Sequence, residues 1–291
     1  MNGWIVLDKP KGLSSAAGVA KVRNLFDRVK AGHGGTLDPL ATGVLPIALG
    51  EATKVMGYIL NSNKAYRATV AWGESRDTDD AEGAVTATSA HRPDRAAILA
   101  ALPRFTGRLI QQPPAYSALK VGGRRAYAAA RAGEPVALKP REIEVFALEL
   151  VENSENHAVF DVSCGKGTYV RALARDLALA LGTVGHLGDL RRTQAGPFVE
   201  SQAISLATLE DLSHSARLAE ALLPLETALD DIPALALDGA TAARLRHGQT
   251  VSVSTGLKDG IVFVTSDNVP VAMAQLSDGT LKPVRVFNYS S

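Results

Sequence analysis

The chain has 291 residues and a formal net charge of +1, so its net charge indicates neither a basic nor an acidic partner. With 46% hydrophobic and 21% charged residues it can bury a core, which excludes disordered, collagen-like and coiled-coil proteins. Its single cysteine, Cys164, excludes a disulfide scaffold and an all-thiolate zinc site within one chain.

The first quarter of the chain predicts short strands and helices around one long loop. An apolar strand over 4–7 is followed by a turn, and Ser14 or Ser15 can cap a helix. Four glycines and one proline within 31–43 predict a loop. The other predicted elements of this part are a buried strand over 44–49, a helix over 51–60 and an alternating strand over 64–72.

The middle of the chain mixes helical and strand-type segments. The acidic segment 74–82 predicts a loop, and Pro93 near a first turn predicts a helix that runs to residue 102. Strand-type residues at 142–151 and 158–163 predict a pair of strands. The other predicted elements are a strand over 111–121, a basic helix over 124–131, a loop over 164–167 and a helix over 168–181 that Gly182 ends.

The chain is expected to form two domains. An acidic, helical segment over 201–229 gives way after Pro233 to short β-type runs separated by glycine turns. We therefore expect a large domain over 1–232 and a small β domain over 233–291. Neither a signal-peptide pattern nor the roughly 20 consecutive apolar residues of a membrane span is found, so we expect a cytoplasmic protein.

Basic residues are concentrated in three segments. There are nine basic and four acidic residues in 1–67, ten and two in 92–141, and five and two in 166–192. By contrast, 193–238 holds eight acidic residues and one basic residue. Such segregation can form a basic face for a polyanion, but solvated helices and loops show the same pattern, and charge alone slightly favours that second interpretation.

Three residues are candidates for chemistry, and each has a structural alternative. Asp38 lies in the glycine-rich loop, where a ligand could approach the backbone closely, or it bonds only its own turn. Arg171 falls in the first turn of its helix, where the macrodipole disfavours a cation unless a carboxylate or phosphate faces it; the alternative is a surface ion pair. Tyr66 can contact a ligand or pack in the core beside Val70.

Other kinds of site are poorly supported. His33 and Asp38 have no third ligand at metal-binding spacing, so no metal site is expected. The Gly-x-Ser-x-Gly motif of serine hydrolases is absent. The segment 165–168 precedes a helix as a phosphate loop does, but it lacks the four-residue spacer and the Lys-Ser/Thr pair.

One motif in the glycine-rich loop carries a family likeness. Residues 32–46 read Gly-His-Gly-Gly-Thr-Leu-Asp-Pro-Leu-Ala-Thr-Gly-Val-Leu-Pro. This closely resembles the catalytic motif of the TruB family, the bacterial tRNA pseudouridine synthases that modify uridine 55. Further segments resemble the family's other motifs in the same order: 8–12 with 14–15, 64–66, 113–120, 164–171 and 190–192. One position departs from the pattern, because Gly34 stands where the family usually has threonine.

The resemblance implies a fold, a reaction and a partner. The fold is α+β, a pseudouridine synthase core on a large mixed, mainly antiparallel sheet with an RNA-gripping insertion at about 112–140 and a small C-terminal PUA-like β domain. The reaction breaks the C1′–N1 bond of uridine and rejoins the base through C5, with no redox step, no cofactor and no metal. The partner is the T-arm of tRNA, and neither a membrane nor a protein partner is required.

The resemblance also implies roles for individual residues. Asp38 is the catalytic carboxylate, which either attacks C1′ or acts through a glycal intermediate. The positive charge of Arg171 nearby would favour the ionised form of Asp38. Tyr66 stacks on the flipped uracil and can remove a proton late in the reaction. The residues implied to bind the substrate are His33, Leu190, Tyr169, Lys9, Pro10, Arg124 and Arg125. Of these, Lys9 and Pro10 would act by supporting the catalytic loop.

Two other functions stay open at this stage. A guide-RNA-dependent relative from box H/ACA particles would share these motifs, but such relatives lack the basic insertion. A non-catalytic RNA chaperone or binding module would need none of Asp38, Tyr66 and Arg171, all of which are present.

Overall fold

The computed structural model describes residues 1–116, 120–121, 124–125 and 138–289. Nine of the described strands of the large domain form one sheet. Its order is β1 (Gly3–Lys9), β3 (Thr42–Leu49), β12 (Gly185–Ala195), β4 (Lys64–Trp72), β11 (His157–Cys164), β10 (Arg141–Asn153) and β7 (Gly107–Gln111), with β2 (Ala31–His33) on β3 and β13 (Phe198–Val199) on β12. Described neighbours run antiparallel except β3 and β12, so the expected mixed, mainly antiparallel sheet is confirmed.

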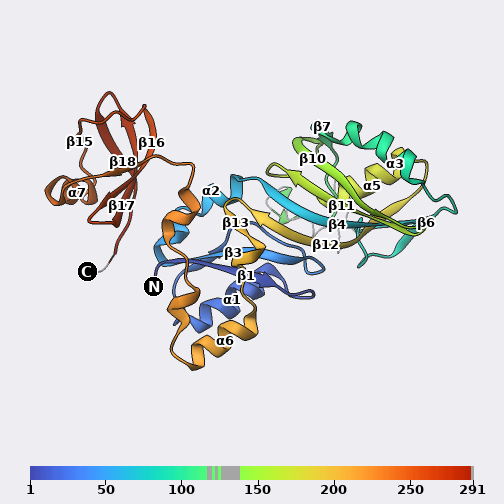
Figure 1. Cartoon of the computed structure of the whole chain (residues 1–291), viewed down its shortest axis with the longest axis horizontal. Coiled ribbons are helices and arrows are strands. Elements are labelled where there is room, and N and C mark those ends of the chain that lie inside the picture. Colours follow the sequence, from blue (N-terminus) through green and yellow to red (C-terminus); the bar gives the residue numbers. More distant parts are fainter. Residues whose placement is uncertain (117–119, 122–123, 126–137, 290–291) are drawn as a thin grey trace.

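Helices pack near both ends of this sheet. Figure 1 shows α1 (Ser15–Leu25) and α6 (Leu206–His214) beside β1, and α3 (Arg95–Ala101) beside β10. The helix α5 (Val170–Ala180) contacts β12 and β4. The buried stripe of α5, with Leu173 and Leu177, packs on Val70 of β4 and Phe160 of β11. Burial of these apolar side chains fixes α5 against the middle strands.

The residues after 233 form a small β domain at one end of the molecule (Figure 1). Its described elements are β14 (Ala234–Ala236), β16 (Gly260–Ser266), β17 (Val269–Ser277), β18 (Thr280–Val286) and β15 (Val251–Ser252), in sheet order, and α7 (Gly239–Arg246). Phe263 and Phe287 of this domain share an apolar cluster with Trp4 and Phe198 of the large domain. Among the described residues, none of the helices has the length and apolar character that crossing a membrane requires.

Many of the predicted elements are confirmed. The strands expected at 4–7, 44–49 and 64–72 are β1, β3 and β4. The helix expected after Ser14 is α1, and the Ser14 hydroxyl caps it by accepting a hydrogen bond from the Ala17 N–H. The paired strands β10 and β11 and helix α5 also form as expected, and the short β-type runs after Pro233 form strands β15 to β18.

Two predicted loops are wrong in part because their ends join sheets. The segment 31–43 begins with β2, whose backbone pairs with β3. The acidic segment 74–82 begins with β5 (Glu74–Arg76), which pairs with β6 (Val85–Thr88). In both cases the next strand along the chain supplies the backbone hydrogen bonds, which the composition of the segment itself does not indicate.

Four predicted elements are shorter or different. The strand expected over 111–121 is wrong over 112–116, which follow the end of β7 and contain two prolines that lack the N–H a sheet needs. Its last two residues belong to another strand, β8 (Lys120–Val121). The helix expected over 124–131 is wrong at its start, where Arg124–Arg125 form β9 and pair with β8; residues 126–131 lie outside the described part. The helix expected over 51–60 is divided into a 3₁₀ helix, η1 (Gly50–Lys54), and the α-helix α2 (Met56–Asn61). The helix expected over 201–229 is divided into α6 and three 3₁₀ helices: η3 (Glu200–Gln202), η4 (Leu218–Ala221) and η5 (Leu225–Leu229).

Candidate active site

A cavity of about 270 Å³ opens where the Asp38 loop, β4, β12 and the segment before α5 meet. Its lining includes five of the predicted site residues: Asp38, Tyr66, Tyr169, Arg171 and Leu190. A larger cleft of about 760 Å³ lies between α2 and residues 228–232 and contains none of these side chains. Chemistry, and not size, therefore identifies the smaller cavity as the candidate site.

Arg171 and Asp38 form an ion pair in the cavity lining. The Nη2 atom of Arg171 lies 2.9 Å from Oδ2 of Asp38. The arginine side chain is 7% exposed, whereas that of the aspartate is 38% exposed. The buried cation fixes the direction of the carboxylate, which stays open to a ligand. The two residues that the sequence singles out are thus brought together.

A second carboxylate, which the sequence analysis missed, holds the other side of Arg171. The Nη1 atom of Arg171 donates to the Thr78 carbonyl at 3.0 Å and lies 3.5 Å from Oδ2 of this carboxylate, Asp80. Asp80 is 4% exposed, and its Oδ1 accepts hydrogen bonds from the Thr78 hydroxyl and the Glu82 N–H. The guanidinium is held between two carboxylates, of which Asp38 lines the cavity.

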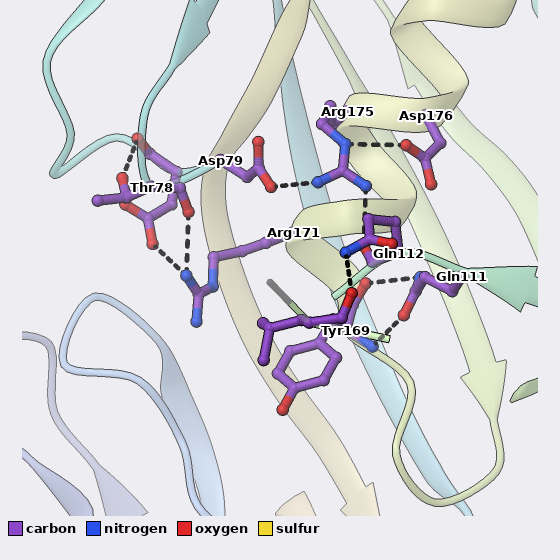
Figure 2. Close-up of polar contacts among 10 residues, drawn as sticks. Thr78, Asp79, Gln111, Gln112, Tyr169, Arg171, Arg175 and Asp176 are labelled. Carbon is purple, nitrogen blue, oxygen red and sulfur yellow. Dashed lines mark hydrogen bonds and ion pairs between the residues drawn. The ribbon is translucent and has the colours of Figure 1, made fainter. Parts of the chain in front are cut away.

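The helix that carries Arg171 is anchored by Arg175, one turn further along. Figure 2 shows both arginines pointing from α5 toward the segment with Thr78 and Asp79. Nη1 of Arg175 lies 2.6 Å from Oδ2 of Asp79, and its Nη2 donates to the Gln112 carbonyl at 2.9 Å. Burial raises the pKa of Asp79, and the charge of Arg175 opposes that shift. These contacts tie the segment that binds Arg171 to the helix itself.

Buried polar groups near the N-terminus hold the Asp38 loop. The Ser15 hydroxyl donates to the Leu37 carbonyl and accepts from the Leu37 N–H, both at 2.8 Å. The fully buried Lys9 ammonium donates to the Pro39 carbonyl at 3.3 Å and to two carbonyls of its own turn. Burial lowers the pKa of Lys9 to about 8, while the charge of Asp38 acts in the opposite direction. Lys9 therefore positions the loop from outside the cavity lining.

Tyr66 and Arg192 lie opposite each other on β4 and β12. Burial raises the pKa of Tyr66, and the charge of Arg192 opposes that shift. Lys64, two residues before Tyr66 on β4, donates to three carbonyls at the end of α2, and burial lowers its pKa to about 8. This side of the cavity therefore carries positive charge.

The remaining predicted contacts near α5 also lie at the cavity. Leu190 is 7% exposed and forms part of the lining, as does Tyr169. The Tyr169 backbone exchanges two hydrogen bonds with the side chain of Gln111, as Figure 2 shows. Gln111, which the sequence analysis did not single out, thereby fixes the start of the helix that carries Arg171.

Other predicted contacts lie elsewhere. His33 pairs with Ile47 in the β2–β3 ladder and is not part of the cavity lining, and Pro10 is exposed in its turn. The side chains of Arg124 and Arg125 lie outside the described part, so their phosphate contacts stay predictions. Within the described ranges, no three His, Cys, Asp or Glu side chains are placed to hold a metal ion.

The glycine that departs from the family motif is required by its neighbour in α2. A Cβ on Gly34 would lie only 2.5 Å from Cγ2 of Ile59, a side chain that is 1% exposed. We expect Gly34→Ala to reduce the free energy of unfolding by about 1–3 kcal/mol through this overlap. Urea denaturation of the variant and the wild type measures the change.

A second substitution tests whether Ile59 is the cause. Leucine at position 59 keeps the volume of isoleucine but has no branch at Cβ, so Ile59→Leu alone is expected to cost less than about 1.5 kcal/mol. In the Gly34→Ala background it should recover most of the lost stability. Simple additivity of the two losses would show that the overlap lies elsewhere.

Protein-family models match almost the whole chain. Residues 23–170 match the TruB family pseudouridylate synthase (N terminal domain). Residues 171–230 match the tRNA pseudouridylate synthase B C-terminal domain, and 233–287 match pseudouridine synthase II TruB, C-terminal.

Curated relatives and solved structures are similar over nearly the full length. The tRNA pseudouridine synthase B of Bradyrhizobium diazoefficiens is 54% identical, over 99% of this chain and 86% of the relative. That of Caulobacter vibrioides is 50% identical, over 99% and 96%. A structure of an H/ACA ribonucleoprotein bound to a substrate RNA containing 2′-deoxyuridine matches with a TM-score of 0.76 and 26% identity, over 99% of this chain and 85% of that one. A Cbf5-Nop10-Gar1 complex matches with a TM-score of 0.76 and 28% identity, over 98% and 85%.

Proposed function

The chain belongs to the TruB family of pseudouridylate synthases, and from this premise we propose that it converts uridine 55 in the T-loop of tRNA to pseudouridine. It is an isomerase of the tRNA pseudouridine synthase class. The observation that carries the proposal is the ion pair of Asp38 and Arg171 in a cavity that Tyr66 and Leu190 also line.

The target base must leave its stack to reach this cavity. A base in a folded RNA loop is stacked, and flipping it out costs a few kcal/mol, less where the loop is already strained. In the proposed complex the flipped uracil stacks on Tyr66 and packs against Leu190, both of which face the cavity. Lys166 on the same lining supplies positive charge for the phosphates on either side of the base.

Asp38 begins the reaction as a carboxylate. It either attacks C1′ of the ribose or removes a proton from C2′, and the C1′–N1 bond breaks in both routes. The uracil then turns in the cavity, C5 bonds to C1′, and Tyr66 accepts the proton that C5 loses. Arg171 holds the carboxylate in one direction throughout, because its own position is fixed by Thr78 and Asp80.

We also propose that the protein acts alone on free tRNA in the cytoplasm. The guide-RNA-dependent alternative is less well supported, because the H/ACA ribonucleoprotein structure is 26% identical to this chain and the tRNA pseudouridine synthases B cited above are 50–54% identical. A non-catalytic chaperone would have no use for a buried arginine held between two carboxylates.

The proposal is tested with purified protein and a tRNA transcript that carries tritium at C5 of its uridines. We expect one equivalent of tritium to be released per tRNA, without a guide RNA or a second protein. A transcript with cytidine at position 55 is the control and should release none. Release that requires added guide RNA, or release from the control transcript, would contradict the assignment.

A further inference from the structure

A buried arginine beside the cavity has neutral partners where a buried cation usually has a carboxylate. Arg192 is 1% exposed and donates to the carbonyl oxygens of Val44 at 2.7 Å and Gly35 at 3.1 Å. Its positive charge also acts on the hydroxyl of Tyr66. The adjacent Arg191 instead pairs with acidic side chains, as surface arginines commonly do. The burial of Arg192 therefore calls for an explanation.

The fold places Arg192 and Tyr66 as a direct cross-strand pair. They are register partners on the antiparallel strands β12 and β4, so their side chains point to the same face of the sheet. Both line the cavity that contains Asp38. The charge of the guanidinium therefore acts on the Tyr66 hydroxyl from across the same face of the sheet.

The charges around the Tyr66 hydroxyl act in opposite directions. Burial, the Cys164 thiol of β11 and Asp38 all raise its pKa, whereas Arg192 lowers it. Two more cations, Lys64 on the same strand and Lys166 before α5, line the same cavity. Of these cations, the guanidinium of Arg192 lies opposite Tyr66 on the neighbouring strand and lowers the pKa of its phenol. Its loss would make the phenolate form harder to reach.

We propose that Arg192 is a positioning residue for the last proton transfer of the reaction, stabilising the phenolate form of Tyr66 in which its oxygen takes the proton from C5. The inference rests on the proposed function, in which Tyr66 accepts this proton. After C5 has bonded to C1′, the C5–H bond breaks, its electron pair returns to the ring, and the proton goes to the phenolate to give a neutral phenol. The phenol later returns the proton to water, and Arg192 keeps its charge throughout.

Arg192 also has a structural contact that a test must separate from this role. Its bond to the Gly35 carbonyl supports the loop of Asp38, so its loss could slow the reaction at C1′ as well. A substrate that cannot lose a proton from C5 distinguishes the two steps. With 5-fluorouridine at position 55, rearrangement to a C5-linked product needs no transfer to Tyr66.

The test measures single-turnover rates with tRNA that carries uridine, 5-deuteriouridine or 5-fluorouridine at position 55. We expect Arg192→Gln to slow uridine conversion about 10- to 100-fold and to raise the H/D rate ratio at C5 above that of the wild type. Rearrangement of 5-fluorouridine should change by less than about threefold. Arg192→Lys keeps a charge but cannot reach both partners, so its H/D ratio should lie between those of the wild type and Arg192→Gln.

Two further variants complete the design. The matched control is Arg191→Gln, because Arg191 is the next residue and points to Asp8 and Glu200. This variant should leave the H/D ratio unchanged. Tyr66→Phe should raise the ratio as Arg192→Gln does, and combining the two should slow the reaction no further. If Tyr66→Phe leaves the ratio unchanged, Tyr66 does not accept the proton and that part of the proposed function fails.

The inference about Arg192 fails on different results. It is wrong if Tyr66→Phe raises the ratio but Arg192→Gln slows uridine and 5-fluorouridine equally and leaves the ratio at the wild-type value, because Arg192 then only supports the loop. Circular dichroism and tRNA affinity establish that each variant is folded. If Arg192→Gln does not fold, Arg192→Lys decides, and a wild-type ratio in that variant overturns the proposal.

Discussion

Replacing Asp38 by asparagine is expected to reduce pseudouridine formation by about 10⁴-fold or more, the size of effect seen when a reacting carboxylate or nucleophile is removed from an enzyme. An amide neither attacks C1′ nor removes a proton from C2′, so both routes stop at their first step. The side chain keeps its shape and an oxygen that accepts a hydrogen bond from Arg171, which is 2.9 Å away in the wild type. Tritium release from C5 of the tRNA measures the loss.

A matched variant separates the loss of chemistry from the loss of a surface charge. Asp189 is a 53% exposed aspartate of β12 that pairs with Lys11 and does not line the cavity. Asp189→Asn should keep the rate within about threefold of the wild type, because exposed ion pairs contribute little. Binding of tRNA by Asp38→Asn should also stay close to the wild type. Full tritium release by Asp38→Asn would show that another group performs the first step.

The sequence alone was sufficient for the elements whose pattern is local. Strand β4 alternates clearly, the stripe of α5 has helical spacing, and the Ser14 cap is visible before its helix. The central strand β12 was missed because it carries Asp189, Arg191 and other polar residues that interrupt an apolar pattern. Its pairing with β3 and β4 is a tertiary feature that sequence spacing does not reveal.

The same limit applies to the candidate site. Asp38, Tyr66 and Arg171 were singled out because each lies in a motif, and the structure brings them to one cavity. Asp80 lies in an acidic segment that local composition assigns to a solvated loop. Its burial depends on Arg171, which donates to Thr78 from 93 residues away in the chain. Nothing local to the segment indicates that one of its carboxylates is buried.

The second large effect is expected at Arg171, where lysine should not replace arginine. Two nitrogens of the guanidinium serve different partners at once, Nη2 facing Asp38 and Nη1 facing Thr78 and Asp80. A lysine ammonium is a single point with a shorter reach and cannot hold this geometry. We expect Arg171→Lys to lower the single-turnover rate about 10²- to 10³-fold, because a shift of about 1 Å in a reacting group can cost 10²-fold.

Arg175→Lys is the matched control, since the same substitution is made one turn along the same helix. Arg175 also joins two partners, Asp79 and the Gln112 carbonyl, but it does not line the cavity. Its replacement should lower thermal stability while the rate at a permissive temperature stays within about tenfold of the wild type. Comparable rates for the two variants would mean that Arg171 serves only to hold the fold. If the guanidinium of Arg171 fixes the direction of Asp38, only Arg171→Lys should lose rate, and it should keep its affinity for tRNA.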